Sequence, residues 1–191
     1  MKAIDDFKYK KSLKALNKML DGFTRYQMVQ NLTTARSIGI VFYLHDQTTM
    51  DEVLNLKQYF EGLNIHVQAL GYYNGKEIPQ YYTMHSGVDV FDKERVNWFG
   101  KPDSPIIDTF VSKNFDILVD LNFDEIITLR WVSSLSKARF KVGAANYQKN
   151  PFDLIVSVDK AKGLNYLCEQ VKQILYQLNN RFAQAPTSQQ P

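Results

Sequence analysis

The sequence predicts a three-layer α/β/α sandwich of the Rossmann-like type, with a mostly parallel sheet of about five to six strands and an N-terminal helical arm. Two segments, residues 38–44 (IGIVFYL) and 115–121 (FDILVDL), are apolar on both faces, as strands are when helices cover both sides of a sheet. Between and after such segments, apolar residues recur every three or four positions, which is typical of amphipathic helices. Strands that alternate with helices in this way indicate the α/β class.

The N-terminal arm, residues 1–36, is expected to be a basic amphipathic helix. Apolar residues recur at helical spacing as far as Leu20, Gly22 interrupts them, and residues 26–32 are expected to resume a short helical turn. The arm holds eight lysine and arginine residues against three aspartates, whereas residues 37–191 hold fifteen basic against seventeen acidic ones. The formal charge of +3 therefore resides in the arm, and nucleic acid is not the expected partner of the nearly neutral remainder.

The arm has two possible roles. The favoured expectation is that its apolar stripe docks on the rest of the chain and leaves the lysines in water. The alternative is that residues 1–20 contact a protein partner, an acidic surface or a membrane surface. The sequence identifies no other partner.

The rest of the chain is expected to form one α/β domain, residues 37–182, followed by a disordered polar tail, residues 183–191. The strands of this domain are expected at residues 38–44, 65–73, 88–91, 115–121, 140–143 and 153–158. Its helices are expected near residues 50–62, 105–111, 124–137 and 162–182.

Polar residues at the predicted helix starts indicate caps. Thr48 or Thr49 is expected to cap the first helix of the domain, and Ser104, which precedes a proline, the second. Asp120 lies inside an apolar strand and needs a partner if it is buried, for which Arg130 or a backbone amide is the candidate.

Several classes of protein are excluded by composition and length. The longest apolar run, residues 38–44, has seven residues, where a membrane-spanning helix needs about 20. The first twenty residues contain lysines throughout and no apolar segment typical of a secretory signal. The single cysteine, Cys168, cannot form an internal disulfide and is expected to be a small core residue. We therefore expect a soluble protein of the reducing cytoplasm.

Motifs for cofactors and nucleophiles are missing. The first strand leads into residues 44–49 (LHDQTT) in place of the glycine-rich turn that binds dinucleotides. Residues 71–77 (GYYNGKE) lack the spacing of a phosphate-binding loop and are interpreted as a turn. The three histidines are far apart and no serine occupies a nucleophile elbow. The sequence thus predicts no cofactor and no metal centre.

One group of polar residues remains as a candidate ligand-binding site. These residues follow the predicted strands at their carboxyl ends, where open parallel sheets bind ligands: His45, Asp46, Asn74, Asn122 and Asp124. If the first and fourth strands are neighbours, Asp46, Asn122 and Asp124 face one crevice, with His45 or His85 nearby. Carboxylates gathered in this way can bind a divalent cation or act as a general base. The competing interpretation, which we favour, is that Asp46 forms a turn and that Asp124 and its neighbour cap a helix.

An aromatic loop around residues 97–102 (NWFGKP) is a second candidate. Trp98, with Arg95 and Lys101, could stack on a base or a sugar. The favoured expectation is that the loop packs inward, because large exposed apolar patches are rare.

Residues 115–122 (FDILVDLN), followed by a predicted helix and residues 134–143 (SLSKARFKVG), resemble a strand–helix–strand segment of the N-terminal domain of heptosyltransferase-type glycosyltransferases. The whole chain also resembles an uncharacterised family of bacterial proteins of about this size. The first resemblance implies a Rossmann-like fold, and sugar transfer in that family uses a second half that binds the nucleotide-sugar.

Two hypotheses of function follow. The first is a non-catalytic binding or interaction module that acts through its basic arm or its aromatic loop. The alternative is a small glycosyltransferase-like or nucleotide- or sugar-binding protein that uses the crevice at the carboxyl ends of the strands.

Overall fold

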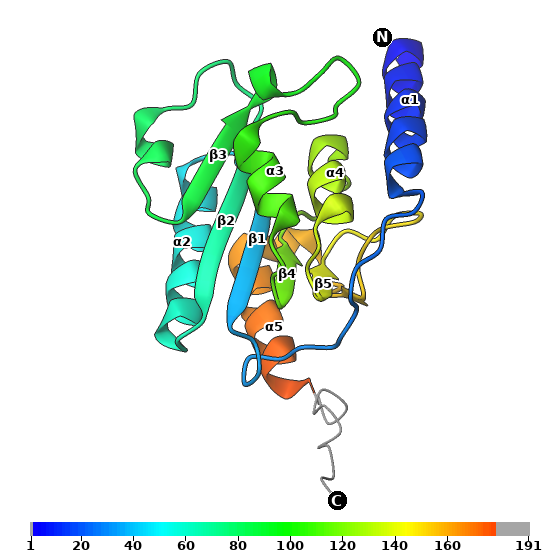
Figure 1. The fold of residues 1–191 in the computed structure, drawn as a ribbon. Helices are drawn as coiled ribbons and strands as arrows, with labels where there is room; N and C mark the ends of the chain where they lie inside the picture. The colour runs from blue at the N-terminus through cyan, green and yellow to red at the C-terminus, as the bar shows by residue number, and fades with distance from the viewer. Residues whose placement is uncertain (1, 179–191) are drawn as a thin grey trace, which may run out of the picture.

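The computed structural model describes residues 2–178, and Figure 1 shows their fold. Within these residues six parallel strands form one sheet in the order β3-β2-β1-β4-β5-β6. The strands are β1 (Ser37–Tyr43), β2 (His66–Tyr73), β3 (Val88–Asp92), β4 (Ile117–Asp120), β5 (Phe140–Gly143) and β6 (Leu154–Ile155). The helices are α1 (Lys2–Leu20), α2 (Gln47–Gly62), α3 (Pro105–Ser112), α4 (Ile127–Leu135) and α5 (Gly163–Gln177). The predicted tail, residues 183–191, and the predicted end of the last helix lie outside the described residues.

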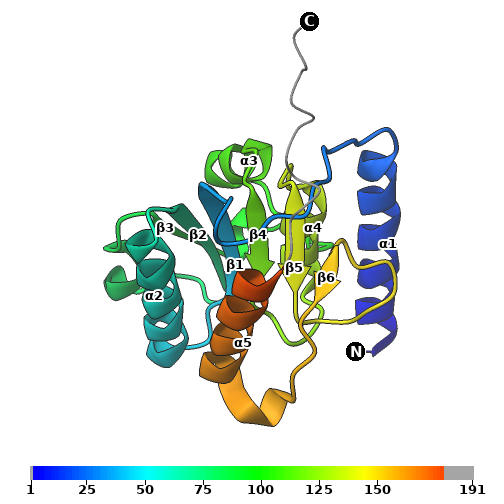
Figure 2. The same ribbon diagram turned by 90° about the horizontal axis from the view of Figure 1, so that it is seen from below.

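Helices cover both faces of the sheet, which confirms the predicted three-layer sandwich. Figure 2 shows α2 and α5 on one face and α3 and α4 on the other, with α1 outermost beside α4. Successive residues of β1 point to opposite faces, as the pleat requires. Ile40 and Phe42 pack in the core beneath α2 and α5, whereas Val41 packs beneath α3 and α4. Because both faces of the sheet are buried at β1, the sequence of this strand is one continuous apolar run.

The arm docks on α4 through a narrow contact. In α1 the side chains of Ser12 and Leu16 are buried, and the Trp131 indole donates a 2.8 Å hydrogen bond to the Ser12 hydroxyl. The helical turn predicted for residues 26–32 is wrong. This segment runs along the amino-terminal end of the sheet, where the Met28 and Leu32 amides donate to the carbonyls of Arg139 and Leu175. Backbone hydrogen bonds to distant strands and helices replace those of a local helix.

The helix starts differ from the predictions in three places. Ser104 stands at the N-cap position of α3, before the predicted proline, but its side chain makes no capping hydrogen bond. Asp46, and not a threonine, caps α2, because its carboxylate accepts hydrogen bonds from the Thr49 amide at 2.8 Å and the Thr49 hydroxyl at 2.9 Å. The helix predicted to begin at Asp124 begins at Ile127, so Asp124 and Glu125 precede it and form no cap. The strand predicted at residues 153–158 is also shorter, since β6 has two residues.

A lysine lies buried under the arm. Lys141 is in the middle of β5, and its ammonium donates a 3.0 Å hydrogen bond to the Ser134 carbonyl at the end of α4. Burial, together with the nearby Arg25, lowers the pKa of Lys141 to about 7. Arg25 itself bonds the Ala138 and Arg139 carbonyls and forms an ion pair with Asp153. These contacts fix the segment after α1 against β5.

Among the described helices, none combines the length and the apolar character needed to cross a membrane.

Candidate functional site

The candidate site is a cavity at the carboxyl ends of β1 and β4. These two strands are neighbours, as the site hypothesis required. The chain leaves β1 toward β2 on one side and leaves β4 toward β5 on the other, so the two connections diverge above the sheet. In open α/β sheets this reversal of strand order leaves a crevice where ligands bind. Here it holds a cavity of about 480 Å³, which we call the switch-point cavity.

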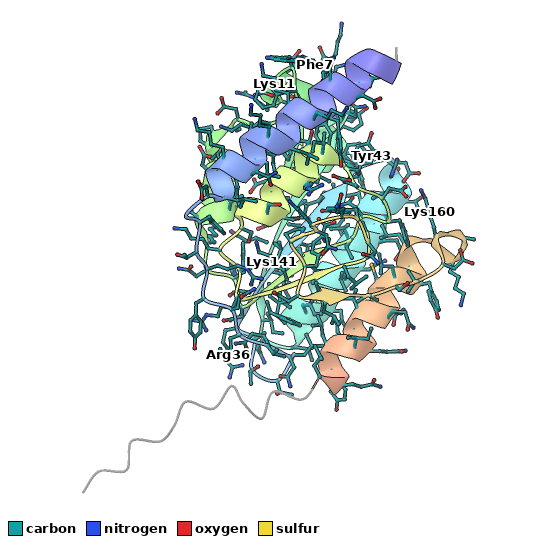
Figure 3. All side chains as sticks on the ribbon, turned by 90° about the vertical axis from the view of Figure 1, so that its right-hand side faces the viewer. Phe7, Lys11, Arg36, Tyr43, Lys141 and Lys160 are labelled. Carbon is teal, nitrogen blue, oxygen red and sulfur yellow. The ribbon has the colours of Figure 1, made fainter. Side chains whose placement is uncertain are left out.

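The surface of the cavity is mainly apolar, although half of the residues that line it are polar or charged. Its lining residues are Phe42, Tyr43, His45, Thr49, Leu121, Asn122, Phe123, Asp124, Glu125, Ile126, Lys160 and Leu164. They come from β1 and the turn after it, from α2, from the β4–α4 connection, and from the turn before α5 and the first residues of that helix. Figure 3 shows Tyr43 and Lys160 near the carboxyl end of the sheet, far from Arg36 at the opposite end.

Asn122 joins the two central strands beneath the cavity. Its side-chain oxygen accepts a 2.8 Å hydrogen bond from the Tyr43 amide, and its side-chain nitrogen donates a 2.6 Å bond to Asp120. Both ends of this buried amide are thus used within the protein. Asn122 therefore holds β1 and the end of β4 together below the cavity, and its side chain has few hydrogen-bonding groups left for a ligand.

Asp120 is a buried carboxyl below the cavity. It accepts hydrogen bonds from the Ser133 hydroxyl at 2.6 Å and from the Asn122 amide at 3.1 Å. Of the two partners predicted, the backbone amide is correct and Arg130 is wrong. Burial raises the pKa of Asp120 to about 6, even though these hydrogen bonds favour the ionised form.

Glu125 connects the cavity wall with the arm. Arg130 forms an ion pair with Glu125 at 2.5 Å, and the Tyr9 hydroxyl of α1 donates to the same carboxylate at 2.9 Å. Arg130 is 6 % exposed, and its second terminal nitrogen donates to the carbonyls of Gln148 and Lys149. Arg130, the predicted partner of Asp120, therefore connects the loop at Glu125 with the loop at Gln148, and through Glu125 it connects both with α1.

The rim of the cavity carries His45, Asp124 and Lys160. The His45 ring is exposed and lies edge-on to Tyr43, with their centroids 4.3 Å apart. Asp124 and Lys160 form an ion pair, and both side chains are largely exposed. Such an exposed pair contributes little to stability, so both charges are accessible to a ligand.

The predicted site residues fall into two groups. His45, Asn122 and Asp124 line the switch-point cavity, whereas Asp46 and Asn74 do not. Asp46 caps α2, and its hydrogen bonds with Thr49 lower its pKa. Asn74 accepts a 3.2 Å hydrogen bond from the Tyr72 hydroxyl.

His85 is also absent from the cavity lining; its ring lies 5.1 Å from that of Tyr81. The aromatic walls and Lys160 were missed by sequence reasoning. Phe123 was detectable, because it lies between two predicted site residues. Lys160 and Leu164 carried no such signal, since only the folded chain brings α5 and the turn before it to this edge of the sheet.

The aromatic loop packs inward only in part, because Pro102 is buried and Phe99 is half-buried, whereas Trp98 is 53 % exposed. The Trp98 ring stacks on Phe7 of α1, with the ring centroids 6.4 Å apart. Lys101 lies 5.9 Å from the buried Trp131 ring and not on Trp98, and Arg95 is exposed. The three predicted stacking residues therefore do not form one site.

The described part of the chain contains no cluster of three or more His, Cys, Asp or Glu side chains placed to hold a metal ion.

The strand order and the crevice together define a Rossmann-like α/β domain. More particularly, the chain belongs to the family described as "Family of unknown function (DUF6913)", whose pattern matches residues 8–178. No curated protein matches the chain.

Among solved structures, the fold is similar to that of an exopolyphosphatase-related protein from Bacteroides fragilis, with 15 % sequence identity and a TM-score of 0.50. The likeness covers 76 % of this chain and 42 % of that one, so this chain spans less than half of its neighbour's length. At this identity the likeness shows the fold alone. The neighbour is not a glycosyltransferase, so it does not support the resemblance predicted for residues 115–143.

Proposed function

We propose that the protein is a non-catalytic domain that binds a small molecule in the switch-point cavity. The observation that carries the proposal is the place of this cavity, because it lies where the strand order reverses between β1 and β4. Ligand pockets in proteins have volumes of about 300–1,000 Å³ and are lined mainly by apolar side chains with a few polar groups. The cavity, at about 480 Å³, fits both criteria.

The lining favours a ligand with a flat apolar body and polar substituents. Tyr43, Phe123 and Leu164 offer rings and a branched chain to such a body, and His45 and Lys160 stand at the rim. The base of a nucleoside or the apolar face of a sugar has this character. The proposed ligand class is therefore a nucleoside, nucleotide or sugar derivative.

The arrangement also bears on where a phosphate would bind. The amino end of a helix usually attracts phosphate, but at α2 the carboxylate of Asp46 already accepts the Thr49 amide. A phosphate would meet a fixed negative charge there. His45 and Lys160 are the alternative donors at the rim. The neighbour's name, exopolyphosphatase-related, is a reason to include phosphate compounds among the candidates.

Binding without catalysis is supported by the state of the carboxyl groups around the cavity. Asp124 is paired with Lys160, and Glu125 with Arg130 and Tyr9. Asp120 is buried beneath its hydrogen-bond donors. Glu125 and Asp120 are therefore held by partners within the protein, which is unlike a general base poised beside its substrate. The single buried thiol, Cys168, supports a place for the protein in the reducing cytoplasm.

The test is thermal unfolding of the purified chain with nucleosides, nucleotides, nucleotide-sugars, monosaccharides and polyphosphate. A true ligand at 100 times its Kd adds about 2.7 kcal/mol to the free energy of unfolding. Leu164→Trp, which fills the cavity, should abolish the effect, and His45→Ala with Lys160→Ala should weaken it. His66→Ala with Lys137→Ala, at exposed residues outside the lining, are the matched controls.

Stabilisation that survives Leu164→Trp in a folded variant would place the ligand elsewhere. Turnover of a stabilising compound would refute the non-catalytic part of the proposal.

A further inference from the structure

The outward face of α1 carries lysines that the described residues do not neutralise. Ser12 and Leu16 fix the inward side of the helix, and Lys11, Lys14 and Lys18 recur at three- and four-residue spacing on the opposite side. These lysines are exposed, and none of them forms an ion pair within residues 2–178. This face is thus a basic ridge over two turns of helix.

Two exposed aromatic rings lie at one end of this ridge. Phe7 is 62 % exposed, and its ring stacks on that of Trp98, from a loop some ninety residues later in the chain. The ammonium of Lys11 lies 4.4 Å from the Trp98 ring. Figure 3 shows Phe7 and Lys11 along α1 at the outer side of the molecule. An apolar pair is therefore exposed directly beside Lys11, at one end of the row of lysines.

We propose that this surface, formed by Phe7, Lys11, Lys14, Lys18 and Trp98, binds an anionic lipid bilayer. The lysines would lie at the phospholipid headgroups, and the two rings would enter the boundary between headgroups and acyl chains. The buried side of α1 stays docked on α4 through Ser12 and Leu16. The domain thus binds peripherally, as a folded unit.

Charge and position favour a bilayer over other acidic partners. Because α1 is the outermost helix beside α4 in Figure 2, its outward face is open to a broad surface. Its basic residues are all lysines, whereas specific contacts with phosphates and bases commonly use the planar fork of arginine. A bilayer offers negative charge and an apolar layer next to each other, which the adjacent lysines and rings both require.

The test is flotation of the purified full chain with vesicles of phosphatidylglycerol and phosphatidylcholine in a ratio of about 1:2, and with phosphatidylcholine alone. We expect binding to the anionic vesicles, weakened in about 1 M salt by screening. Each lysine near such a surface strengthens binding about five-fold, so Lys11→Glu/Lys14→Glu/Lys18→Glu should reduce the partition coefficient at least a hundred-fold. Lys76→Glu/Lys137→Glu/Lys162→Glu makes the same charge change at exposed residues off the ridge and should retain most binding.

The two tryptophans supply a second readout. Trp131 is 1 % exposed and Trp98 is 53 % exposed, so a blue shift of emission on vesicle binding must come from Trp98. The shift should disappear in Trp98→Phe, whose binding persists because the ring is kept. Phe7→Ala/Trp98→Ala should weaken binding about ten-fold without altering its salt dependence.

Three outcomes would overturn the proposal. The first is that the protein binds neutral vesicles as well as anionic ones. The second is that the ridge and control variants lose binding equally while both remain folded. The third is that the protein retains a single-stranded oligonucleotide and does not bind vesicles. Far-UV circular dichroism and thermal unfolding of each variant establish that α1 remains folded.

Discussion

The buried carboxyl of Asp120 gives the sharpest test of the structure. Its pKa is raised from 3.8 to about 6 because the ionised form loses water below the switch-point cavity. The folded state therefore holds this proton more tightly than the unfolded chain does. The contribution of the protonated Asp120 carboxyl to the free energy of unfolding is fully present below about pH 3.8 and is lost as pH rises through about 6. A shift of roughly two pKa units corresponds to about 3 kcal/mol.

Asp120→Asn removes the titration and keeps the shape. The asparagine oxygen can still accept from Asn122, and its nitrogen can donate to the Ser133 hydroxyl, which rotates. Urea unfolding of both proteins at intervals from about pH 3.5 to about pH 7 should show wild type losing about 3 kcal/mol relative to the variant. Parallel pH profiles, or a wild type that gains relative stability as pH rises, would refute the view that burial controls this carboxyl.

Three further predictions concern the packing around the sheet. Between about pH 7 and about pH 10 the wild type should gain about 4 kcal/mol in free energy of unfolding, because its lowered pKa favours neutral Lys141 in the fold. Lys141→Met should remove this gain, which urea unfolding across that pH range measures. Ser12→Ala should destabilise the protein by about 1–3 kcal/mol, since the buried Trp131 indole loses its acceptor, and hydrogen exchange should quicken in α1 before the sheet. Gly71→Ala should cost about 1–3 kcal/mol in thermal unfolding, because the new Cβ lies 2.6 Å from the Phe42 ring; an unchanged Tm would contradict the packing against this cavity wall.

Much of the fold could be predicted from sequence because its elements have local patterns. Residues 38–44 and 115–121 are apolar on both faces, and these two segments are the central neighbours β1 and β4. Helix boundaries were less predictable. Asp46, Thr48 and Thr49 all have capping side chains, and which one caps α2 depends on where the chain leaves β1.

The candidate site was predictable only in part. His45, Asn122 and Asp124 follow strands in sequence, so the rule for parallel sheets placed them at one edge. Lys160 reaches the same edge from a distant segment, and its role depends on tertiary packing. The exposure of Trp98 also could not be predicted, because the partners of its ring, Phe7 and Lys11, lie on the arm.

The hydrogen bond from Tyr9 to Glu125 has a consequence for communication within the molecule. It joins the arm to a residue that lines the switch-point cavity, and Arg130 ties the same carboxylate to the loop at Gln148. A force that displaces α1 must break this bond or carry Glu125 with it. By thermodynamic linkage, an occupant of the cavity that favours one position of Glu125 must in turn favour one position of α1. If such an occupant binds, any effect that it has on α1 is matched by an equal effect of α1 on its affinity.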